Sequence, residues 1–286
     1  MRVSSTLAVN PAARALWHIE TNFGNALTLD DIAQAAGVSR FHLARVFETR
    51  MGHSVMGYVR ARRLAIAARQ LAAGAPDILA VALDAGYGSH EAFTRAFSAA
   101  FGATPEAVRQ GGTVTPYDLQ EAIPMPDTVI DTPSPHTLRP GRAMIIGGLA
   151  GRYTPETAAA IPSLWQNFVQ WLPDVPGRTG EAHTTYGLAY NQTDTSFDYM
   201  AGVEVDPKAG LPDGFTKVGL KALTYAVFPH TGHISGIRGT WGAIWDKWLP
   251  ESGLKVLPEP VFEKYGPNFD GMTGEGGLEL WVPVEG

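Results

Sequence analysis

The chain has 286 residues, a formal net charge of −6 and no cysteine. This length favours two domains, and the lack of cysteine excludes disulfides, thiolate metal sites and cysteine nucleophiles. No run of 18 or more apolar residues occurs, so we expect no membrane-spanning helix and no membrane partner. The first residues, MRVSSTLAVNPAAR, contain no apolar signal core, and we therefore expect a cytoplasmic protein.

The charge is divided unevenly along the chain. Residues 1–110 hold 11 arginines, no lysine and 8 acidic residues, a net charge of +3. Residues 111–286 hold 11 basic and 20 acidic residues, a net charge of −9. The basic first part could face the phosphates of nucleic acid, whereas the acidic second part suits a different partner.

Residues 9–110 have the composition of an all-helical domain. They are rich in Ala, Leu and Arg and lack runs of Val, Ile or Thr. Cap residues and glycine stops predict helices over residues 11–23, 28–36, 39–52, 54–73, 76–85 and 89–102, with a short last helix from 104.

Two of these helices repeat one pattern fifty residues apart. SRFHLARVFETRMG (39–52) and SHEAFTRAFSAAFG (89–102) each begin with a serine cap, end in glycine and follow a short helix and a turn. This is helix-turn-helix spacing. Hydrophobic side chains at i, i+4 and i+8 would face inward in both copies, namely Leu43, Phe47 and Met51, then Phe93, Phe97 and Phe101.

The other face of each copy carries residues that could contact DNA. A recognition helix enters the major groove with its N-terminal end first, where Arg can contact guanine bidentately and Glu can accept from cytosine. The exposed candidates are Arg40, Phe41, Ala44 and Arg45, then His90, Glu91, Thr94 and Arg95. The alternative is a plain helical bundle, although a bundle has no need of two similar solvent-facing helices.

Residues 27–109 resemble the DNA-binding domain of AraC/XylS-type transcription regulators. The resemblance rests on LDDIAQAAGVSRFHLARVFETRMG in the first motif and DILAVALDAGYGSHEAFTRAFSAAFGATPEAVR in the second. It implies two helix-turn-helix units, joined by the helix over 54–73, on neighbouring major-groove segments of double-stranded operator or promoter DNA. Carried over by position, the DNA contacts are Ser39, Arg40, Phe41, Ala44 and Arg45, then Ser89, His90, Glu91, Thr94 and Arg95, with Arg40 on a phosphate. Ala44 departs from the large polar residue that is common in the family, which would weaken base reading by the first motif.

Residues 111–124 form the predicted linker between the first domain, 1–110, and the second, 125–286. Prolines interrupt any helical period there, and an edge strand could follow around 127–132. From residue 141 onward, the order strand, helix, strand, strand occurs twice, and both helices end in Trp-Leu-Pro, at 171–173 and 248–250. This pattern predicts an α+β domain of tandem βαββ repeats.

Aromatic side chains concentrate in the second half, which holds six of the seven tryptophans. Trp241, Trp245 and Trp248 follow helical spacing, which is typical of core packing against a sheet. Tyrosines on the predicted strands need partners for their hydroxyls and are also consistent with a pocket for a flat or cationic ligand. The candidate ligand-binding aromatics are Tyr153, Trp165, Tyr186, Tyr199, Tyr225, Trp245, Tyr265 and Trp281.

Two glutamates fall within apolar strands. Glu263 shares a strand face with Tyr265, and Glu279 shares one with Trp281. Either could be a partly buried carboxylate that attracts a cation or acts as an acid or base. The alternative places each on the solvent-exposed face of a half-buried sheet.

No metal and no cofactor are predicted. His230 and His233 are three residues apart but lack a third ligand. The glycine-rich stretch GEGG at 274–277 has no Lys-Ser/Thr after it and indicates a turn rather than a phosphate loop.

Residues 125–286 resemble a GyrI-like effector-binding domain. The resemblance rests on GGLAGRYTPETAAAIPSLWQNF, TYGLAYN, FDYMAGVEV, TYAVFPHTG, WDKWLPESG, PVFEKYG and LELWVPV, in that order. It implies tandem strand-helix-strand-strand units flanking a cleft for a small, cationic or amphipathic organic effector. It also implies that Glu263 meets the positive charge of that effector.

These observations predict a sequence-specific transcription regulator rather than an enzyme. Its expected partners are double-stranded DNA and a small organic effector, with RNA polymerase as a further candidate. One alternative is a C-terminal domain that transforms its ligand with Glu263 as acid or base, as some relatives without DNA-binding domains do. The other is a C-terminal domain that only binds another protein.

Overall fold

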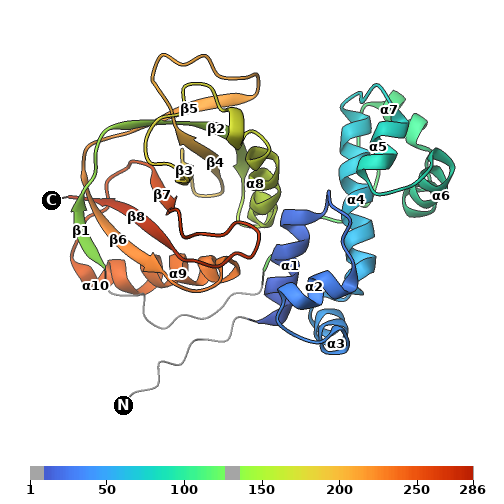
Figure 1. Cartoon of the computed structure of the whole chain (residues 1–286), viewed down its shortest axis with the longest axis horizontal. Coiled ribbons are helices and arrows are strands. Elements are labelled where there is room, and N and C mark those ends of the chain that lie inside the picture. The colour runs from blue at the N-terminus through green and yellow to red at the C-terminus, as the bar shows by residue number, and fades with distance from the viewer. Residues whose placement is uncertain (1–9, 126–135, 286) are drawn as a thin grey trace. The chain divides into compact units, whose positions relative to one another are not determined.

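The computed structural model describes residues 10–125 and 136–285 and divides into two compact units (Figure 1). The helical unit consists of residues 18–123, and the sheet unit of residues 1–17 together with 124–286. The residues of the first helix fall on both sides of this division. The strand predicted around 127–132 lies outside the described residues. The predicted class, an all-helical domain followed by an α+β domain, is confirmed.

The helices that precede the sheet begin and end close to the predicted residues. They are α1 (Pro11–Asn22), α2 (Leu29–Ala35), α3 (Arg40–Met51), α4 (Val55–Ala72), α5 (Ile78–Asp84), α6 (His90–Phe101) and α7 (Pro105–Gly111). Thr28 and Asp31 form a capping box at the start of α2. Gly52 and Gly102 end α3 and α6 in the left-handed conformation, with φ of 70° and 67°. Local capping chemistry therefore explains why these boundaries could be read from the sequence.

The fifty-residue repeat is a repeat of structure as well as sequence. Helices α3 and α6 have equal length, begin after Ser39 and Ser89, and end at glycine. The inward side chains of Phe47 and Phe97 are completely buried. Residues fifty apart therefore occupy equivalent places in the two helix-turn-helix motifs.

The segment after α7 packs onto the helical unit instead of leaving it. The ring of Tyr117 lies 6.1 Å from that of Phe101. Further on, Arg62 of α4 donates to the carbonyl oxygen of Gln120 at 2.9 Å, and the amide of Ile123 donates to a tyrosine hydroxyl of the same helix at 3.1 Å. Most of the predicted linker, 111–124, is thus held on the helical unit by partners that are remote in sequence.

The helical unit contains a buried ion pair between Glu20 and Arg62. Arg62 donates from Nε and Nη2 to the two carboxylate oxygens of Glu20, at 2.9 and 2.8 Å. The hydroxyl of Tyr58 donates to the same carboxylate at 2.6 Å. These three side chains join α1 to α4, and both charged groups are almost wholly buried.

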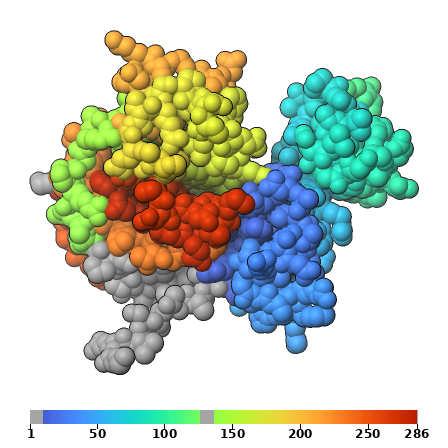
Figure 2. Space-filling model, in the orientation of Figure 1, coloured from blue at the N-terminus to red at the C-terminus, as the bar shows by residue number. Residues whose placement is uncertain are grey.

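The sheet unit contains one eight-stranded antiparallel sheet in the order β1-β6-β8-β7-β3-β4-β2-β5. Its strands are β1 (Thr137–Pro140), β2 (Met144–Tyr153), β3 (Thr185–Tyr190), β4 (Phe197–Glu204), β5 (Phe215–Leu220), β6 (Thr224–His230), β7 (Val261–Tyr265) and β8 (Leu278–Val284). The two repeats, β2-α8-β3-β4 and β6-α9-β7-β8, meet where β3 pairs with β7. Figure 2 shows segments of the first repeat in yellow against the second in red. The edge strands β1 and β5 were not recognised as strands in the sequence, because each pairs on one side only and has a largely exposed pattern.

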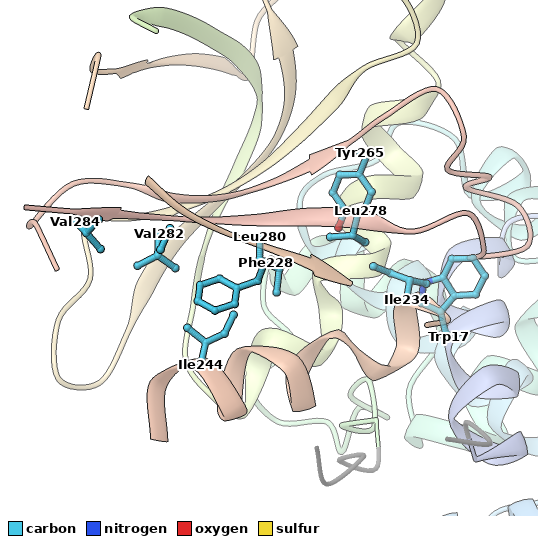
Figure 3. Close-up of a cluster of buried hydrophobic side chains, with 10 residues drawn as sticks. Trp17, Phe228, Ile234, Ile244, Tyr265, Leu278, Leu280, Val282 and Val284 are labelled. Carbon is cyan, nitrogen blue, oxygen red and sulfur yellow. The ribbon is translucent and has the colours of Figure 1, made fainter. Parts of the chain in front are cut away.

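Helices α8 (Ile161–Val169) and α9 (Ile237–Ala243) pack on one face of the sheet. The predicted second helix is divided, since a π-helical turn (Ile244–Trp248) and α10 (Leu249–Ser252) follow α9. Figure 3 shows Ile244 pointing from this helix towards Phe228 and Leu280 of the sheet. The opposite face of the sheet has a separate buried cluster that includes Tyr186, Tyr225 and Phe262. Both faces are therefore buried, and strand alternation decides which side chains meet.

Candidate functional site

The two recognition helices present equivalent exposed side chains at their N-terminal ends. Phe41 is 78% exposed, and Arg45 one turn later is also exposed. At the positions fifty residues on, Glu91 and Arg95 are exposed in the same way. All four side chains are exposed and lie outside the core, so contact with a major groove would not disturb the packing.

The remaining predicted DNA contacts divide into three kinds. Ser39 and Ser89 cap their helices by accepting from the amides of His42 and Ala92, at 3.3 and 3.2 Å. Arg40 and His90 are exposed at the first helical position, and the Arg40 guanidinium lies 5.4 Å from the centre of the Phe41 ring. Ala44 and Thr94 are half-buried, and Thr94 Oγ1 is a buried atom without a hydrogen-bond partner among the described residues. The position shared by Ala44 and Thr94 therefore faces partly inward.

In the sheet unit, Glu263 of β7 is buried, with 7% exposure, among groups that donate hydrogen bonds to it. Tyr199 of β4 and Tyr265 of β7 donate to Oε2, at 2.6 and 2.7 Å. Trp241 of α9 donates from Nε1 to Oε1 at 3.0 Å. Strand β4 of the first repeat and β7 and α9 of the second thus all supply groups around one carboxylate.

A further tryptophan sets the direction of this network. Trp165 of α8 donates from Nε1 to the hydroxyl of Tyr199 at 3.1 Å. Because an indole nitrogen can only donate, the Tyr199 hydroxyl accepts this bond and donates its own hydrogen bond to Glu263. The ring of Trp165 also lies 4.9 Å from that of Tyr265, edge to face. The site is therefore built to present donors to a carboxylate acceptor.

Burial dominates the electrostatics of this site. It raises the pKa of Glu263, although the three hydrogen bonds act in the opposite direction. Burial, together with the neighbouring Glu263 charge, raises the pKa values of Tyr199 and Tyr265 well above the ordinary value. Within the described part of the chain, the side chains that donate hydrogen bonds to Glu263 are all neutral, and no cationic side chain contributes to its pKa shift.

Gly187 of β3 makes room for this arrangement. A Cβ at this position would overlap the hydroxyl of Tyr199 and approach Oε2 of Glu263 to 2.6 Å. Since β3 lies between β4 and β7, any larger residue here would displace the carboxylate or its donor.

The structure gathers only part of the predicted ligand set around Glu263. Trp165, Tyr199 and Tyr265 are in the network, and Tyr153 lies beside Tyr199 with ring centres 6.5 Å apart. Trp245 stacks on Trp241 at 6.2 Å. Trp241 itself was placed only in the core stripe by its helical spacing, and nothing local in the sequence marks its contact with Glu263.

Four predicted ligand residues lie on the opposite face of the sheet. Tyr186, Tyr225 and Trp281 belong to or pack against the cluster around Phe262. Glu279 is paired there with Arg139 of β1 at 2.7 Å and accepts from Trp281 Nε1 at 3.1 Å. The structure therefore separates the two predicted carboxylates, and Glu279 has a cationic partner of its own.

The histidines at the end of β6 are engaged in local bonds. His230 Nδ1 lies 2.8 Å from the Thr240 hydroxyl, and His233 Nδ1 lies 2.8 Å from the Ser235 hydroxyl. Within residues 10–125 and 136–285, no cluster of three or more His, Asp or Glu is arranged to hold a metal ion. No helix in that part of the chain has the length and apolar character needed to cross a membrane.

Comparison with known families assigns both units. Residues 139–285, about half of the chain, match the GyrI-like small molecule binding domain, and residues 32–111 match a helix-turn-helix domain. The chain is an AraC/XylS-type regulator with a GyrI-like domain. It is a DNA-binding transcription regulator, and its GyrI-like domain is a module that binds small molecules.

Relatives of this AraC/XylS-type regulator extend over almost its whole length. The transcriptional regulator Rob of Salmonella typhimurium is 26% identical over 280 residues, which cover 93% of each chain. The right origin-binding protein of Escherichia coli is 27% identical over 297 residues, covering 94% of this chain and 96% of the relative. Among solved structures, SAV2435 bound to tetraphenylphosphonium is 20% identical and covers 53% of this chain and 94% of its own, with a TM-score of 0.44.

Proposed function

We propose that the GyrI-like domain binds a bulky organic cation whose charge is met by Glu263, and that this effector controls promoter binding by the AraC-type domain. A buried carboxylate without a counter-ion is unfavourable, because desolvation of its charge is not offset by a cation. A cationic effector would supply the missing charge. This uncompensated carboxylate is the observation that carries the proposal.

The hydrogen bonds to Glu263 restrict the kind of cation. A carboxylate has about four acceptor sites, and two on Oε2 and one on Oε1 are already used by Tyr199, Tyr265 and Trp241. At most one N–H group of a ligand could therefore be accepted without breaking the network. A tertiary ammonium, quaternary ammonium or aryl phosphonium ion fits this restriction better than a primary ammonium with three N–H donors.

The aromatic rings near the carboxylate support the same chemistry. The indole rings of Trp241 and Trp245 stack nearly parallel, with 15° between their planes, and the ring of Trp165 meets that of Tyr265 edge to face at 4.9 Å. Indole faces attract cations that have lost their water, by about 2 kcal/mol or more. Apolar groups on the cation would gain further from contact with these rings.

In the AraC-type domain we assign DNA contacts to the exposed residues of α3 and α6, above all Arg45 and Arg95. The bound chain would act on transcription through RNA polymerase at the promoter, and therefore in the cytoplasm. We infer a binding role for Glu263 rather than a catalytic one. Its hydrogen-bond partners among the described residues, Tyr199, Tyr265 and Trp241, all donate to it and so hold it as an acceptor.

Titration of the full chain with a matched pair of ions tests the effector proposal. Tetraphenylphosphonium and tetraphenylborate have nearly the same shape and opposite charge. We expect the cation to quench tryptophan fluorescence with saturation and the anion to have no such effect. The Glu263→Gln variant should lose at least about tenfold in affinity for the cation, a change of 1.4 kcal/mol.

Glu279→Gln is the control, because it removes a carboxylate on the opposite face of the same sheet and should leave the affinity unchanged. Equal binding of the two ions, or an equal loss in both variants, would contradict the proposal. Conversion of the cation to a product during the titration, abolished by Glu263→Gln, would instead support catalysis.

A further inference from the structure

Helices α3 and α6 offer a direct comparison of two DNA-reading surfaces, because residues fifty apart occupy equivalent places. Arg45 and Arg95 are the same residue at one exposed position. One turn closer to the helix start, Phe41 stands in α3 where Glu91 stands in α6. The two helices therefore have the same arginine at one position, whereas at the other α3 has an apolar residue and α6 an acidic one.

We propose that α3 recognises a thymine through Phe41 and a guanine through Arg45, whereas α6 recognises a cytosine through Glu91 and a guanine through Arg95. The operator would thus consist of two unlike subsites, each of which contains a guanine. This inference rests on DNA binding by the AraC-type domain and is independent of the effector.

Phe41 can recognise only an apolar feature of the major groove. Its ring has no hydrogen-bonding atom, yet it is 78% exposed, more than the other large hydrophobic side chains in the described part of the chain. The thymine C5 methyl is the one apolar group that an unmodified base pair presents in the major groove. The guanidinium of Arg40 lies over the ring at 5.4 Å, so the cation beside Phe41 can remain close to the neighbouring phosphate.

Glu91 requires a donor on the base. It is exposed, and hydrogen bonds from the backbone at the helix start and from Ser89 lower its pKa, so it is ionised at neutral pH and only accepts. Cytosine N4 and adenine N6 are the donors in the major groove, but adenine also presents the N7 acceptor, which repels a carboxylate. Cytosine is the base that satisfies Glu91 without this repulsion, and guanine, with two acceptors, is the one it rejects most.

Arg45 and Arg95 each lie four residues beyond these positions. An α-helix rises about 6 Å over four residues, and stacked bases are about 3.4 Å apart, so the two contacts of one helix fall within about two base steps. Arg pairs bidentately with O6 and N7 of guanine. Each subsite therefore consists of a guanine and, within about two steps of it, a thymine for α3 or a cytosine for α6.

Selection of DNA from a random library by the full chain tests this assignment, with Phe41→Glu and Glu91→Phe as variants. The parent should enrich both subsites. Phe41→Glu should change the thymine to a cytosine, and Glu91→Phe should change the cytosine to a thymine, while both guanines persist. Glu48→Gln, an exposed change two turns along α3, is the control and should select the parental sequence.

A second measurement removes one methyl group without altering the protein. Replacement of the selected thymine by deoxyuridine should weaken the parent about fourfold, as expected for one buried methyl, and should leave the affinity of Phe41→Ala unchanged. Unaltered operators from both exchange variants, or an equal deoxyuridine effect on parent and Phe41→Ala, would overturn the base assignment. Failure of the parent to enrich any sequence would instead refute sequence-specific binding itself. Because Phe41 and Glu91 are exposed, circular dichroism should show that every variant folds as the parent does.

Discussion

Glu20 in the helical unit and Glu263 in the GyrI-like domain are both buried carboxylates, and they are held by opposite means. Glu20 receives two hydrogen bonds from the guanidinium of Arg62, whereas Glu263 receives its bonds only from two tyrosines and a tryptophan. The first charge is neutralised within the fold and joins two helices. The second has no cationic partner among the described residues, which leaves its carboxylate available to a cation from outside. The partners of a buried acid therefore decide whether it is interpreted as a structural residue or as a candidate binding residue.

The comparison predicts that Glu20→Gln is the most damaging of these changes. It would leave the buried Arg62 guanidinium without its paired carboxylate, which costs about 3–5 kcal/mol of unfolding free energy. Urea unfolding followed by circular dichroism would measure this loss. Arg69 lies on α4, as Arg62 does, and Arg69→Met removes its exposed ion pair with Glu121, which should cost at most about 1 kcal/mol. Equal losses in the two variants would remove the special role assigned to Glu20.

A smaller effect is expected when the space beside Glu263 is filled. Gly187→Ala places a methyl group against the Tyr199 hydroxyl and the carboxylate, and overpacking of this kind costs about 1–3 kcal/mol. The affinity of this variant for tetraphenylphosphonium should also fall, because the carboxylate and its donors must shift. Gly219→Ala in β5, where a Cβ would make only an ordinary contact, is the matched control. Unchanged cation affinity in Gly187→Ala would show that the packed geometry is not required.

Acidification should weaken cation binding by up to about tenfold for each pH unit below the pKa of Glu263. Only the ionised carboxylate attracts a cation, so protonation competes with the effector. Since burial raises this pKa, the loss begins at a higher pH than for an ordinary glutamate, whose pKa is near 4.5. Fluorescence titrations from neutral pH downward would measure it. Affinity that stays constant down to the onset of acid unfolding would contradict a charged Glu263.

The smallest effect is expected for the stability of Glu263→Gln. This change removes an uncompensated buried charge, which stabilises the fold, but it also replaces an acceptor oxygen with a donor, which loses a hydrogen bond. The two effects oppose each other, and the unfolding free energy should stay within about 1 kcal/mol of the parent. A loss as large as that of Glu20→Gln would mean that Glu263 is structural.

Much of the helical unit could be read from the sequence, because its helices begin and end through local interactions. Thr28, Ser39 and Ser89 cap helices within three residues of themselves, and Gly52 and Gly102 end them through their own backbone conformation. The duplicated motif was visible for the same reason. Placing residues 112–123 was not possible in this way, since Gln120 and Ile123 are held by side chains about sixty residues earlier.

In the GyrI-like domain, the sequence identified the residues on each strand face but not which face the helices cover. Period-two alternation placed Glu263 with Tyr265 and Glu279 with Trp281, and both pairs looked equally suited to a ligand. Only tertiary packing distinguished them, because α8 and α9 bring Trp165 and Trp241 to the first pair while β1 brings Arg139 to the second. The sequence by itself determined the two domains, the doubled recognition helix and the acidic candidates, all of which depend on local patterns. Which carboxylate remains without a counter-ion depends on contacts between segments far apart in the chain, and only the tertiary structure decided it.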